Sequence, residues 1–267
     1  MSARDAVTRL FRELTGRDAD GVWSAPGRVN LIGEHTDYND GFVLPFATPH
    51  RTYAAVGMRD DDRIRVASTF TEKPVEAAIS ELESLFPISA EQDAWAAYPL
   101  GVAWALRLAG ARGRGVDIAI ASDVPVGAGL SSSAAIEGAT ASALNALWDA
   151  GLDRTALASI GRRAENEAVG APTGIMDQMA SMLGEADAAL FLDCRSLEAQ
   201  SIPLGMAEAG LAVLVIDTRV AHAHSTGGYR ERRASCEKGA AIMDVAALRD
   251  LSTADLPRAE GLMDDIT

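Results

Sequence analysis

The chain has 267 residues, 48% of them hydrophobic, and a formal net charge of −14 at pH 7. This length fits one large domain or two modest ones, with ample apolar material for a core. The acidic balance argues against general nucleic-acid binding, which requires a basic surface. Any bound phosphate must be held by local amide dipoles, a few cations and a metal ion, because the field of the whole chain opposes it.

The two cysteines, Cys194 and Cys236, provide neither a disulfide framework nor a cluster of metal ligands. No apolar run reaches the roughly 18 residues of a membrane span. The first residues, from Met1 to Asp5, lack the apolar segment of a signal peptide. We therefore expect a cytoplasmic protein with reduced thiols, with no membrane or nucleic-acid partner and no evident obligate protein partner.

Apolar residues at helical spacing predict a surface helix over residues 4–15. Strand character follows up to residue 32, and Glu34, His35 and Asp37 then crowd into four positions. Two carboxylates and an imidazole on a short loop suit recognition of a polyol, because each carboxylate accepts two hydrogen bonds from adjacent hydroxyls. A metal site and a solvated polar turn are the alternatives, although no further His or Cys lies at a spacing that favours a metal.

The middle of the chain alternates strand and helix patterns. Residues 42–47, 52–58 and 63–69 are predicted strands, and residues 93–109 form a strongly apolar predicted helix that ends at Gly110. We expect the tryptophans of that helix to lie in the core rather than to serve as ligand platforms.

The stretch from Asp123 to Ala135, DVPVGAGLSSSAA, is the most informative part of the chain. An alternating run over 116–120 predicts a half-buried strand before it, and an Ala-rich helical pattern follows it. Its glycines allow positive φ and close approach to a ligand, and we expect the serines 131–133 to cap the helix. Free amides at such a helix start form an anion site. The stretch lacks the lysine of a P-loop and the third glycine of a dinucleotide fingerprint, so a tight, well-capped turn is the alternative.

A further helix is predicted over 153–168, opened by Asp153. Pro172 ends it, and we expect Thr173 to cap a new helix with Asp177 in its first turn, where amide dipoles favour an ionised carboxylate. An ordinary acid at a helix start is the alternative for Asp177.

The last part of the chain contains two apolar segments, 188–194 and 211–217, which we predict to be strands. A loop over 222–229 and a helix over 230–250 follow.

These stretches closely resemble the galactokinases, in the GHMP family of small-molecule kinases. Residues 27–38, GRVNLIGEHTDY, resemble the galactokinase signature, and residues 125–134, PVGAGLSSSA, are similar to the nucleotide loop of the family. Residues 174–178, GIMDQ, follow in the expected order, so that the resemblance spans roughly residues 20–240. Chains of the family are longer and carry a third, glycine-rich motif near the C-terminus that nothing here matches.

The resemblance implies an α+β fold of two GHMP domains, over residues 1–185 and 186–267, with the second domain incomplete. It also implies a left-handed βαβ crossover in the first domain, against the usual hand. The implied function is ATP-dependent phosphorylation of α-D-galactose at the C1 hydroxyl, with Mg²⁺ as the cofactor. A kinase for a related sugar such as N-acetylgalactosamine or arabinose, a non-catalytic sensor of sugar and ATP, and an inactive fragment are the alternatives.

The resemblance also assigns roles to individual residues. It makes Asp177 the base for the C1 hydroxyl and Arg28 the cation that stabilises charge beside it. The implied sugar-binding residues are Glu34, His35, Thr36, Asp37, Gly174 and Tyr229. The implied nucleotide-binding residues are Gly127, Ala128, Gly129, Leu130, Ser131, Ser132 and Ser133, and the implied Mg²⁺ ligands are Ser133 and Glu165. Phosphoryl transfer depends mainly on positioning and charge neutralisation, which this set of residues supplies.

Overall fold

The computed structural model describes residues 1–88, 91–125, 127–216 and 228–263. The strands are β1 (Gly21–Asn30), β2 (Phe42–Val43), β3 (Pro45–Met58), β4 (Arg63–Ser68), β5 (Val75–Ala78), β6 (Val116–Ser122), β7 (Ala188–Asp193) and β8 (Ala199–Pro203). The helices are α1 (Ala3–Thr15), α2 (Leu82–Leu85), α3 (Ala97–Leu108), α4 (Ser132–Leu147), α5 (Arg154–Arg163), α6 (Met176–Leu183), α7 (Gly228–Met243) and α8 (Leu256–Leu262).

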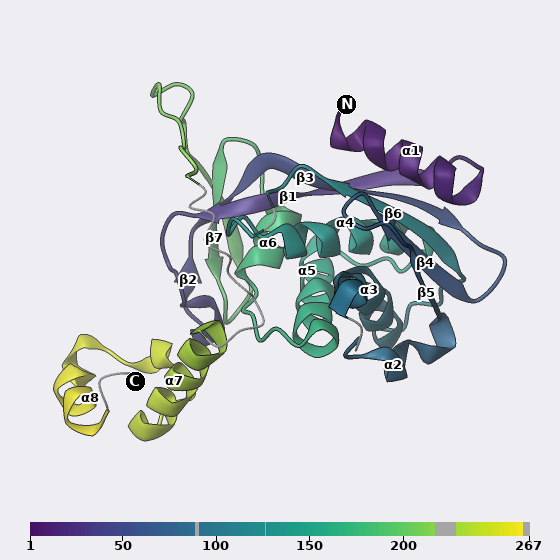
Figure 1. Ribbon diagram of the computed structural model, residues 1–267. Coiled ribbons are helices and arrows are strands. Elements are labelled where there is room, and N and C mark those ends of the chain that lie inside the picture. Colours follow the sequence, from purple (N-terminus) through teal and green to yellow (C-terminus); the bar gives the residue numbers. More distant parts are fainter. Residues whose placement is uncertain (89–90, 126, 217–227, 264–267) are drawn as a thin grey trace.

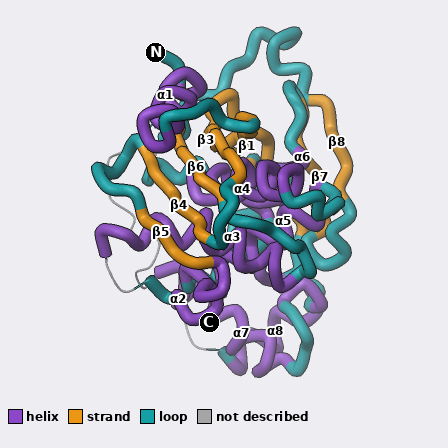
Figure 2. The backbone as a smooth tube through the Cα atoms, turned by 90° about the vertical axis from the view of Figure 1, so that its right-hand side faces the viewer, coloured by secondary structure: helices purple, strands orange, loops and turns teal. Residues whose placement is uncertain are grey.

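The strands form one eight-stranded sheet with the path β2-β7-β3-β6-β4-β5, to which β1 adds through β3 and β8 through β7. Helix α1 covers one face of this sheet, and helices α3 to α6 cover the other face (Figure 1). Figure 2 shows the same separation of strands and helices from the side. Strand β4 is parallel to β6, and the other pairings of the described strands are antiparallel. This architecture confirms the predicted α+β class.

The predicted helix at 4–15 is α1, and its ends follow from the sequence. Ser2 and Asp5 form a reciprocal capping box at its start, and Gly16 takes the left-handed conformation at its end with φ +72°. Val7 and Phe11 are fully buried against the sheet. The helix therefore protects one side of β3 and β6 from water.

Strand β6 is buried on both faces, so the prediction of a half-buried strand was wrong. The alternation that indicated a polar face came from Asp117 and small alanines. Asp117 is only 4% exposed, and its Oδ1 accepts hydrogen bonds from Arg59 Nη1 at 2.9 Å and Arg65 Nε at 2.9 Å. Arg17 Nη2 lies 3.5 Å from Oδ2, so three guanidinium groups satisfy the carboxylate inside the fold, which is the condition for burying a charge.

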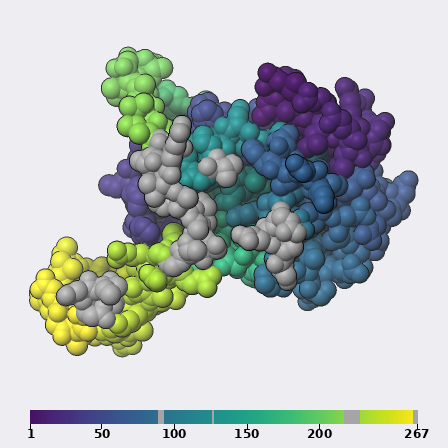
Figure 3. All heavy atoms as spheres, in the orientation of Figure 1, coloured from purple at the N-terminus to yellow at the C-terminus, as the bar shows by residue number. Residues whose placement is uncertain are grey.

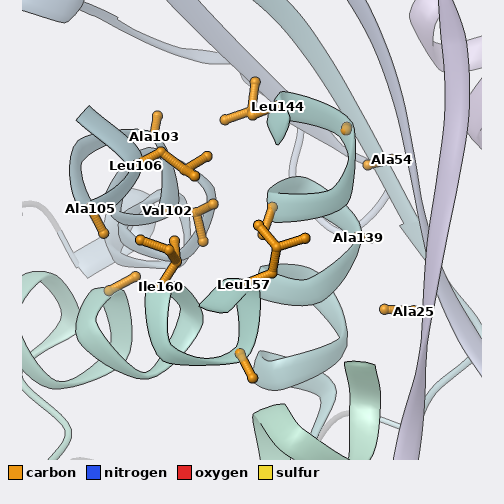
Figure 4. Packing of buried hydrophobic residues seen from close by; sticks show 14 of the residues in the cluster. Ala25, Ala54, Val102, Ala103, Ala105, Leu106, Ala139, Leu144, Leu157 and Ile160 are labelled. Carbon is orange, nitrogen blue, oxygen red and sulfur yellow. The ribbon is translucent and has the colours of Figure 1, made fainter. Parts of the chain in front are cut away.

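The helical layer packs through small and branched apolar side chains. Figure 4 shows Leu106 of α3, Leu144 of α4 and Leu157 of α5 in one cluster, and Ala25 and Ala54 face this cluster from the sheet. The predicted helix over 93–109 is confirmed as α3, preceded by a 3₁₀ turn at Glu91–Ala96, and Gly110 follows it with φ +97°. Burial of this kind contributes about 1.5–3 kcal/mol for each large apolar side chain.

Three further predictions of secondary structure differ from the fold. The predicted strands at 42–47 and 52–58 form the short β2 and one long strand, β3, whereas the strand predicted at 63–69 is confirmed as β4. The predicted helix over 153–168 is α5 followed by a π-helical turn at Ala164–Val169. Residues 211–216 form no strand because no neighbouring described segment pairs with them, and Leu214 is 82% exposed. Residue 217 lies outside the described residues.

Strands β7 and β8 follow residue 185 in the chain, yet they hydrogen-bond into the same sheet through β2 and β3. Helices α7 and α8 lie beside the body, below β2 in Figure 1 and at the yellow end of Figure 3. The predicted loop at 222–229 falls mostly outside the described residues, and Tyr229 belongs to the first turn of α7. Much of the helix predicted at 230–250 is α7, which ends at Met243. The division of the chain at residues 185 and 186 stays a prediction.

Candidate functional site

A cavity of about 1160 Å³ opens at the end of the sheet beside the starts of α4 and α6. Its walls come from segments distant in sequence: the end of β1 with the loop after it, the end of β4 with the residues after it, the start of α3, the end of β6, the loops before α4 and α6, and the start of α7. Most of the residues predicted from the motifs line it, namely Arg28, Glu34, His35, Asp37, Gly127, Gly129, Leu130, Ser131, Ser132, Ser133, Glu165, Gly174, Asp177 and Tyr229. Thr36 and Ala128 do not.

The loop before α4 has the backbone that its glycines predict. Gly127 and Gly129 have φ values of +76° and +73°, a region that side chains with a Cβ rarely adopt. Ser131 also lies in the left-handed region, with φ +54°, and it makes no side-chain cap. The prediction that the serines cap this helix was wrong for Ser131 at the N-cap, because its hydroxyl donates to Asp177 Oδ2 at 2.5 Å instead.

Without that cap, the first-turn amides of α4 remain unclaimed by the N-cap side chain, and Ser132 and Ser133 line the cavity. Amides and the helix dipole at such a position attract anions. The α4 start is therefore suited to a phosphate group.

Asp177 lies in the first turn of α6, as predicted, and Arg28 reaches it from β1. Arg28 Nε donates to Asp177 Oδ1 at 2.7 Å, and the two side chains are only 16% and 25% exposed. Arg28 Nη1 also donates to the carbonyl of Gly129 at 2.8 Å. The arginine thus connects the carboxylate to the glycine-rich loop.

Thr173 does not cap α6, contrary to the prediction, because the N-cap position falls on Ile175. The Thr173 hydroxyl donates instead to Glu165 Oε2 at 2.9 Å. A charged acceptor inside the fold gives this hydroxyl a stronger partner than a backbone amide does.

Asp37 and Gly174 meet at the polar end of the cavity. A Cβ on Gly174 would collide with the carboxylate of Asp37, so only glycine lets the two loops approach this closely. Burial raises the pKa of Asp37, and the nearby charge of Asp177 raises it further. Two acidic groups therefore face the same small space.

His35, Tyr38 and Tyr229 form an aromatic group around that end. The His35 ring centroid lies 5.8 Å from that of Tyr38 and 5.7 Å from that of Tyr229, and the two tyrosines are 5.3 Å apart. His35 Nδ1 and the Tyr38 hydroxyl share a hydrogen bond of 2.6 Å. The amide of Gly174 donates to the Tyr229 hydroxyl at 3.4 Å, and burial raises the pKa of that hydroxyl. The start of α7 is thereby fixed against both loops.

Two residues of the predicted sugar site have different surroundings. Glu34 lines the cavity, and its Oε1 accepts a hydrogen bond from Asn30 Nδ2 at 3.0 Å. The hydroxyl of Thr36 lies 2.7 Å from the carbonyl groups of Gly33 and Phe42, so its side chain braces the loop from behind.

Glu165 is buried at the base of the cavity, where Gln178 Nε2 donates to its Oε2 at 2.7 Å. The same amide nitrogen donates to Oε2 of Glu137 at 2.9 Å, and Oε1 of Glu137 is buried without a partner. Burial raises the pKa of both glutamates, well above the usual range for Glu137. The sequence motifs gave no signal for Glu137, and they assigned no role to Gln178 at the end of the motif at 174–178. Gln178 joins the two glutamates only in the folded chain.

The donor set at Glu165 fits a Mg²⁺ ion. Ser133 and Glu165 both line the cavity, and Mg²⁺ prefers hard oxygen ligands, one or two of them from protein and the others from water and phosphate. Among the described residues no three His, Cys, Asp or Glu side chains form a metal-binding group. The alternative of a metal held by the cluster at 34–37 therefore gains no support.

The other end of the cavity is aromatic, and sequence reasoning missed it. Phe70, Trp95 and Tyr98 line it. Trp95 Nε1 and Thr71 Oγ1 are buried there without a hydrogen-bond partner. Trp95 packs against the core, as expected, but it also faces the cavity. In the sequence, only Phe70, an aromatic residue close after a predicted strand, could have indicated that this end of the cavity is aromatic.

No helix within the described ranges has the length and apolar character that crossing a bilayer requires.

Comparison with known proteins matches two family models. The model described as the galactokinase galactose-binding signature covers residues 9–58, and the model described as the N-terminal domain of GHMP kinases covers residues 97–185. A galactokinase of Streptomyces coelicolor is 55% identical over 95% of this chain, and a galactokinase of Streptomyces lividans is 50% identical over 92%. The chain spans 64% and 60% of the length of these two relatives, which is less than two thirds.

Solved structures agree on the fold. Galactokinase of Lactococcus lactis, crystallised with galactose, superposes with a TM-score of 0.84 and 29% identity, over 99% of this chain and 68% of that one. Mevalonate kinase of Methanococcus jannaschii superposes with a TM-score of 0.59, over 70% of this chain and 57% of the mevalonate kinase chain. At 20% identity, the second match shows the shared fold alone.

Proposed function

Because this chain belongs to the GHMP kinase family, we propose that it takes part in the ATP-dependent phosphorylation of α-D-galactose at the C1 hydroxyl. The observation that carries the proposal is the contact of Asp177 with both Arg28 and Ser131, at the junction of the two loops that match the family motifs. This junction is where the phosphoryl donor and the sugar must meet. The relatives named as galactokinases, and the solved one that holds galactose, support the choice of sugar.

In this proposal, Asp177 orients the C1 hydroxyl and accepts its proton late in the transfer. Each of its carboxylate oxygens receives one donor from the protein, Arg28 Nε or the Ser131 hydroxyl. A carboxylate oxygen has a second acceptor direction, which is free to receive the substrate hydroxyl. Since phosphoryl transfer has a loose transition state, holding the two reactants in line matters more than base strength.

Arg28 stabilises negative charge between the base and the phosphates, since it touches both Asp177 and the glycine-rich loop. The amides of residues 127–133 hold the phosphates at the start of α4. Ser133 and Glu165 would hold the Mg²⁺ ion, which neutralises phosphate charge in reactions of this class. The base of the nucleotide would lie between Phe70, Trp95 and Tyr98. Trp95 Nε1 and Thr71 Oγ1 have no hydrogen-bond partner there and would be available to bond to the base.

The galactose hydroxyls would be held by Glu34, His35 and Asp37, with Gly174 and Tyr229 completing the wall and Thr36 bracing it. We also propose that residues 1–185 form the first domain and residues 186–267 part of a second one.

The test is ADP release by the chain with ATP, Mg²⁺ and a panel of galactose, N-acetylgalactosamine, arabinose and glucose. Galactose should give the highest rate, and a flat response to it would refute the proposal. Asp177→Ala should reduce turnover by about three orders of magnitude, as loss of positioned proton acceptance and orientation implies, while galactose still raises the melting temperature. Equal activity in that variant would refute the assigned base.

The same melts separate the alternatives. A sensor would show shifts with galactose and ATP but no ADP release, and an inactive fragment would show neither, because a shift requires preferential binding to the folded state.

A further inference from the structure

The helical segment from 228 to 262 contacts the loop at 33–41 at two separate places. Tyr229 of α7 contacts the aromatic group described above. The second contact comes from Arg249, in a 3₁₀ turn at Leu248–Asp250. In Figure 1 this segment lies directly below β2, next to the loop that precedes that strand.

Arg249 joins three segments at once. Its guanidinium pairs with both carboxylate oxygens of Asp193 at the end of β7, with Nη2 to Oδ2 at 2.8 Å. Its Nη1 also donates to the carbonyl of Asp40 at 2.7 Å. The charged group lies 4.3 Å from the ring centroid of Phe42, and that ring stacks on Phe191 at 5.4 Å. A single side chain thus fixes the end of the loop at 33–41 against the sheet.

The loop at 33–41 needs such a hold because its backbone is strained. His35 and Asp40 have φ values of +64° and +58°, which cost energy for residues other than glycine. Asp40 is the C-cap of the 3₁₀ turn Asp37–Asn39, and the amide of Gly41 donates to the carbonyl of Thr36 at 2.8 Å, so Asp37 and Asp40 lie within one hydrogen-bonded turn. A shift of Asp40 would therefore move Asp37 away from Gly174.

We propose that Arg249 is a positioning residue for the carbohydrate site, which sets the location of the Asp37 carboxylate through the carbonyl of Asp40. The proposal rests on the proposed function. Neither matching family model extends to residue 249. The role requires arginine, because only a planar guanidinium can pair bidentately with Asp193, lie over Phe42 and still donate to a carbonyl.

The test compares Arg249→Lys with Arg195→Lys in the full chain. Arg195 lies in the same network, with Nε 3.2 Å from Asp40 Oδ2 and Nη2 2.8 Å from Asp250 Oδ1, but it is 41% exposed and does not hold the carbonyl of Asp40. Both changes keep the positive charge, so any difference in effect comes from the loss of the planar guanidinium geometry. Phe42→Leu is a second, milder variant that removes only the aromatic platform.

Galactose affinity measured by calorimetry should fall about tenfold in Arg249→Lys, the equivalent of one lost charge-assisted hydrogen bond. The KM for galactose should rise in proportion, while kcat and the KM for ATP stay within about twofold, since the loss is of uniform sugar binding. Phe42→Leu should weaken binding in the same direction by a smaller factor, and Arg195→Lys should have no effect. Unchanged galactose affinity in Arg249→Lys, or an equal loss in Arg195→Lys, would overturn the proposal.

A second readout does not depend on sugar binding. The amide of Cys194 donates to the carbonyl of Gly41 at 2.9 Å, and the residue is 7% exposed. Its alkylation, followed by mass spectrometry and compared with the rate in the native chain, should accelerate in Arg249→Lys and not in Arg195→Lys. If the native chain binds no galactose, the proposed function fails, and the labelling rate of Cys194 alone decides whether Arg249 holds this loop.

Discussion

Gly27 lies where β1 passes beneath the loop that precedes α4, and replacing it tests how closely these segments must approach. The register of β1 against β3 shifts between Pro26 and Arg28, which turns the backbone toward that loop. The amide of Arg28 donates to the carbonyl of Leu130 at 3.1 Å. A Cβ on Gly27 would lie 2.5 Å from that same carbonyl oxygen and 2.9 Å from Cγ1 of Val124. One of these contacts is with backbone, so the clash has no flexible side chain to absorb it.

Gly27→Ala should therefore destabilise the fold by about 1–3 kcal/mol, the usual cost of overpacking a closed site. For a chain of this length each kcal/mol lowers the melting temperature by about 2–4 °C, which predicts a decrease of roughly 2–12 °C in calorimetry. Because the loop must shift, the contacts of Arg28 with Gly129 and of Ser131 with Asp177 should loosen. We expect turnover in the ADP-release assay to fall at least tenfold, the effect of a small misplacement of reacting groups.

Gly261→Ala is the matched control. Gly261 lies in α8 without a positive φ, and nothing lies within 4 Å of an added Cβ. This change should leave stability equal or raise it by up to about 1 kcal/mol, because alanine favours helix. If Gly27→Ala melted at the native temperature with full activity, the close approach inferred for β1 and the loop would be refuted.

Two other substitutions test the acidic groups. In Gly174→Ala the new methyl group displaces the Asp37 carboxylate. Galactose binding measured by calorimetry should therefore weaken at least about tenfold, which corresponds to one lost charge-assisted hydrogen bond. ATP binding should stay intact, and an equal loss of affinity for both ligands would contradict this account. Burial and the charge of Glu165 raise the pKa of Glu137, so the native fold favours the protonated acid and loses stability as the pH rises above the unfolded-state pKa of about 4.3. Glu137→Gln should therefore gain stability relative to the native chain as the pH rises from 4 to 8 in urea melts, and an advantage that shrinks with pH would exclude this account.

Local patterns in the sequence predicted the features of the site that depend only on residues close together in the chain. The glycines at 127 and 129 predicted a loop with positive φ, and the break at Pro172 predicted a helix with Asp177 in its first turn. In both cases the determining residues lie within a few positions of the feature. The apolar spacing that predicted a helix over residues 4–15 was equally clear, and α1 runs from Ala3 to Thr15.

The partners of hydroxyl groups were predicted less well, because they lie outside the helix turn that the cap rules consider. Ser131 is 46 residues from Asp177, and Thr173 is eight residues from Glu165. Each hydroxyl donates to the carboxylate of its partner and not to a nearby backbone group of the helix start. A charged acceptor in a partly dry site forms the stronger hydrogen bond. Cap rules describe isolated helices and say nothing about competing acceptors that tertiary packing delivers.

The electrostatics of the cavity extend the argument from net charge. Its described lining includes Glu34, Asp37, Glu165 and Asp177, whereas Arg28 is the single arginine or lysine among those lining residues. Arg28 is already paired with Asp177, so it alone cannot offset the several charges of a nucleotide in an acidic chain. In the proposed function, the remaining attraction would come from the amides at the start of α4 and from a divalent cation held by Ser133 and Glu165. The hydroxyl of Ser131 donates to Asp177 rather than to an amide of α4, so the same contact that supports the carboxylate leaves the positive end of this helix available to a phosphate.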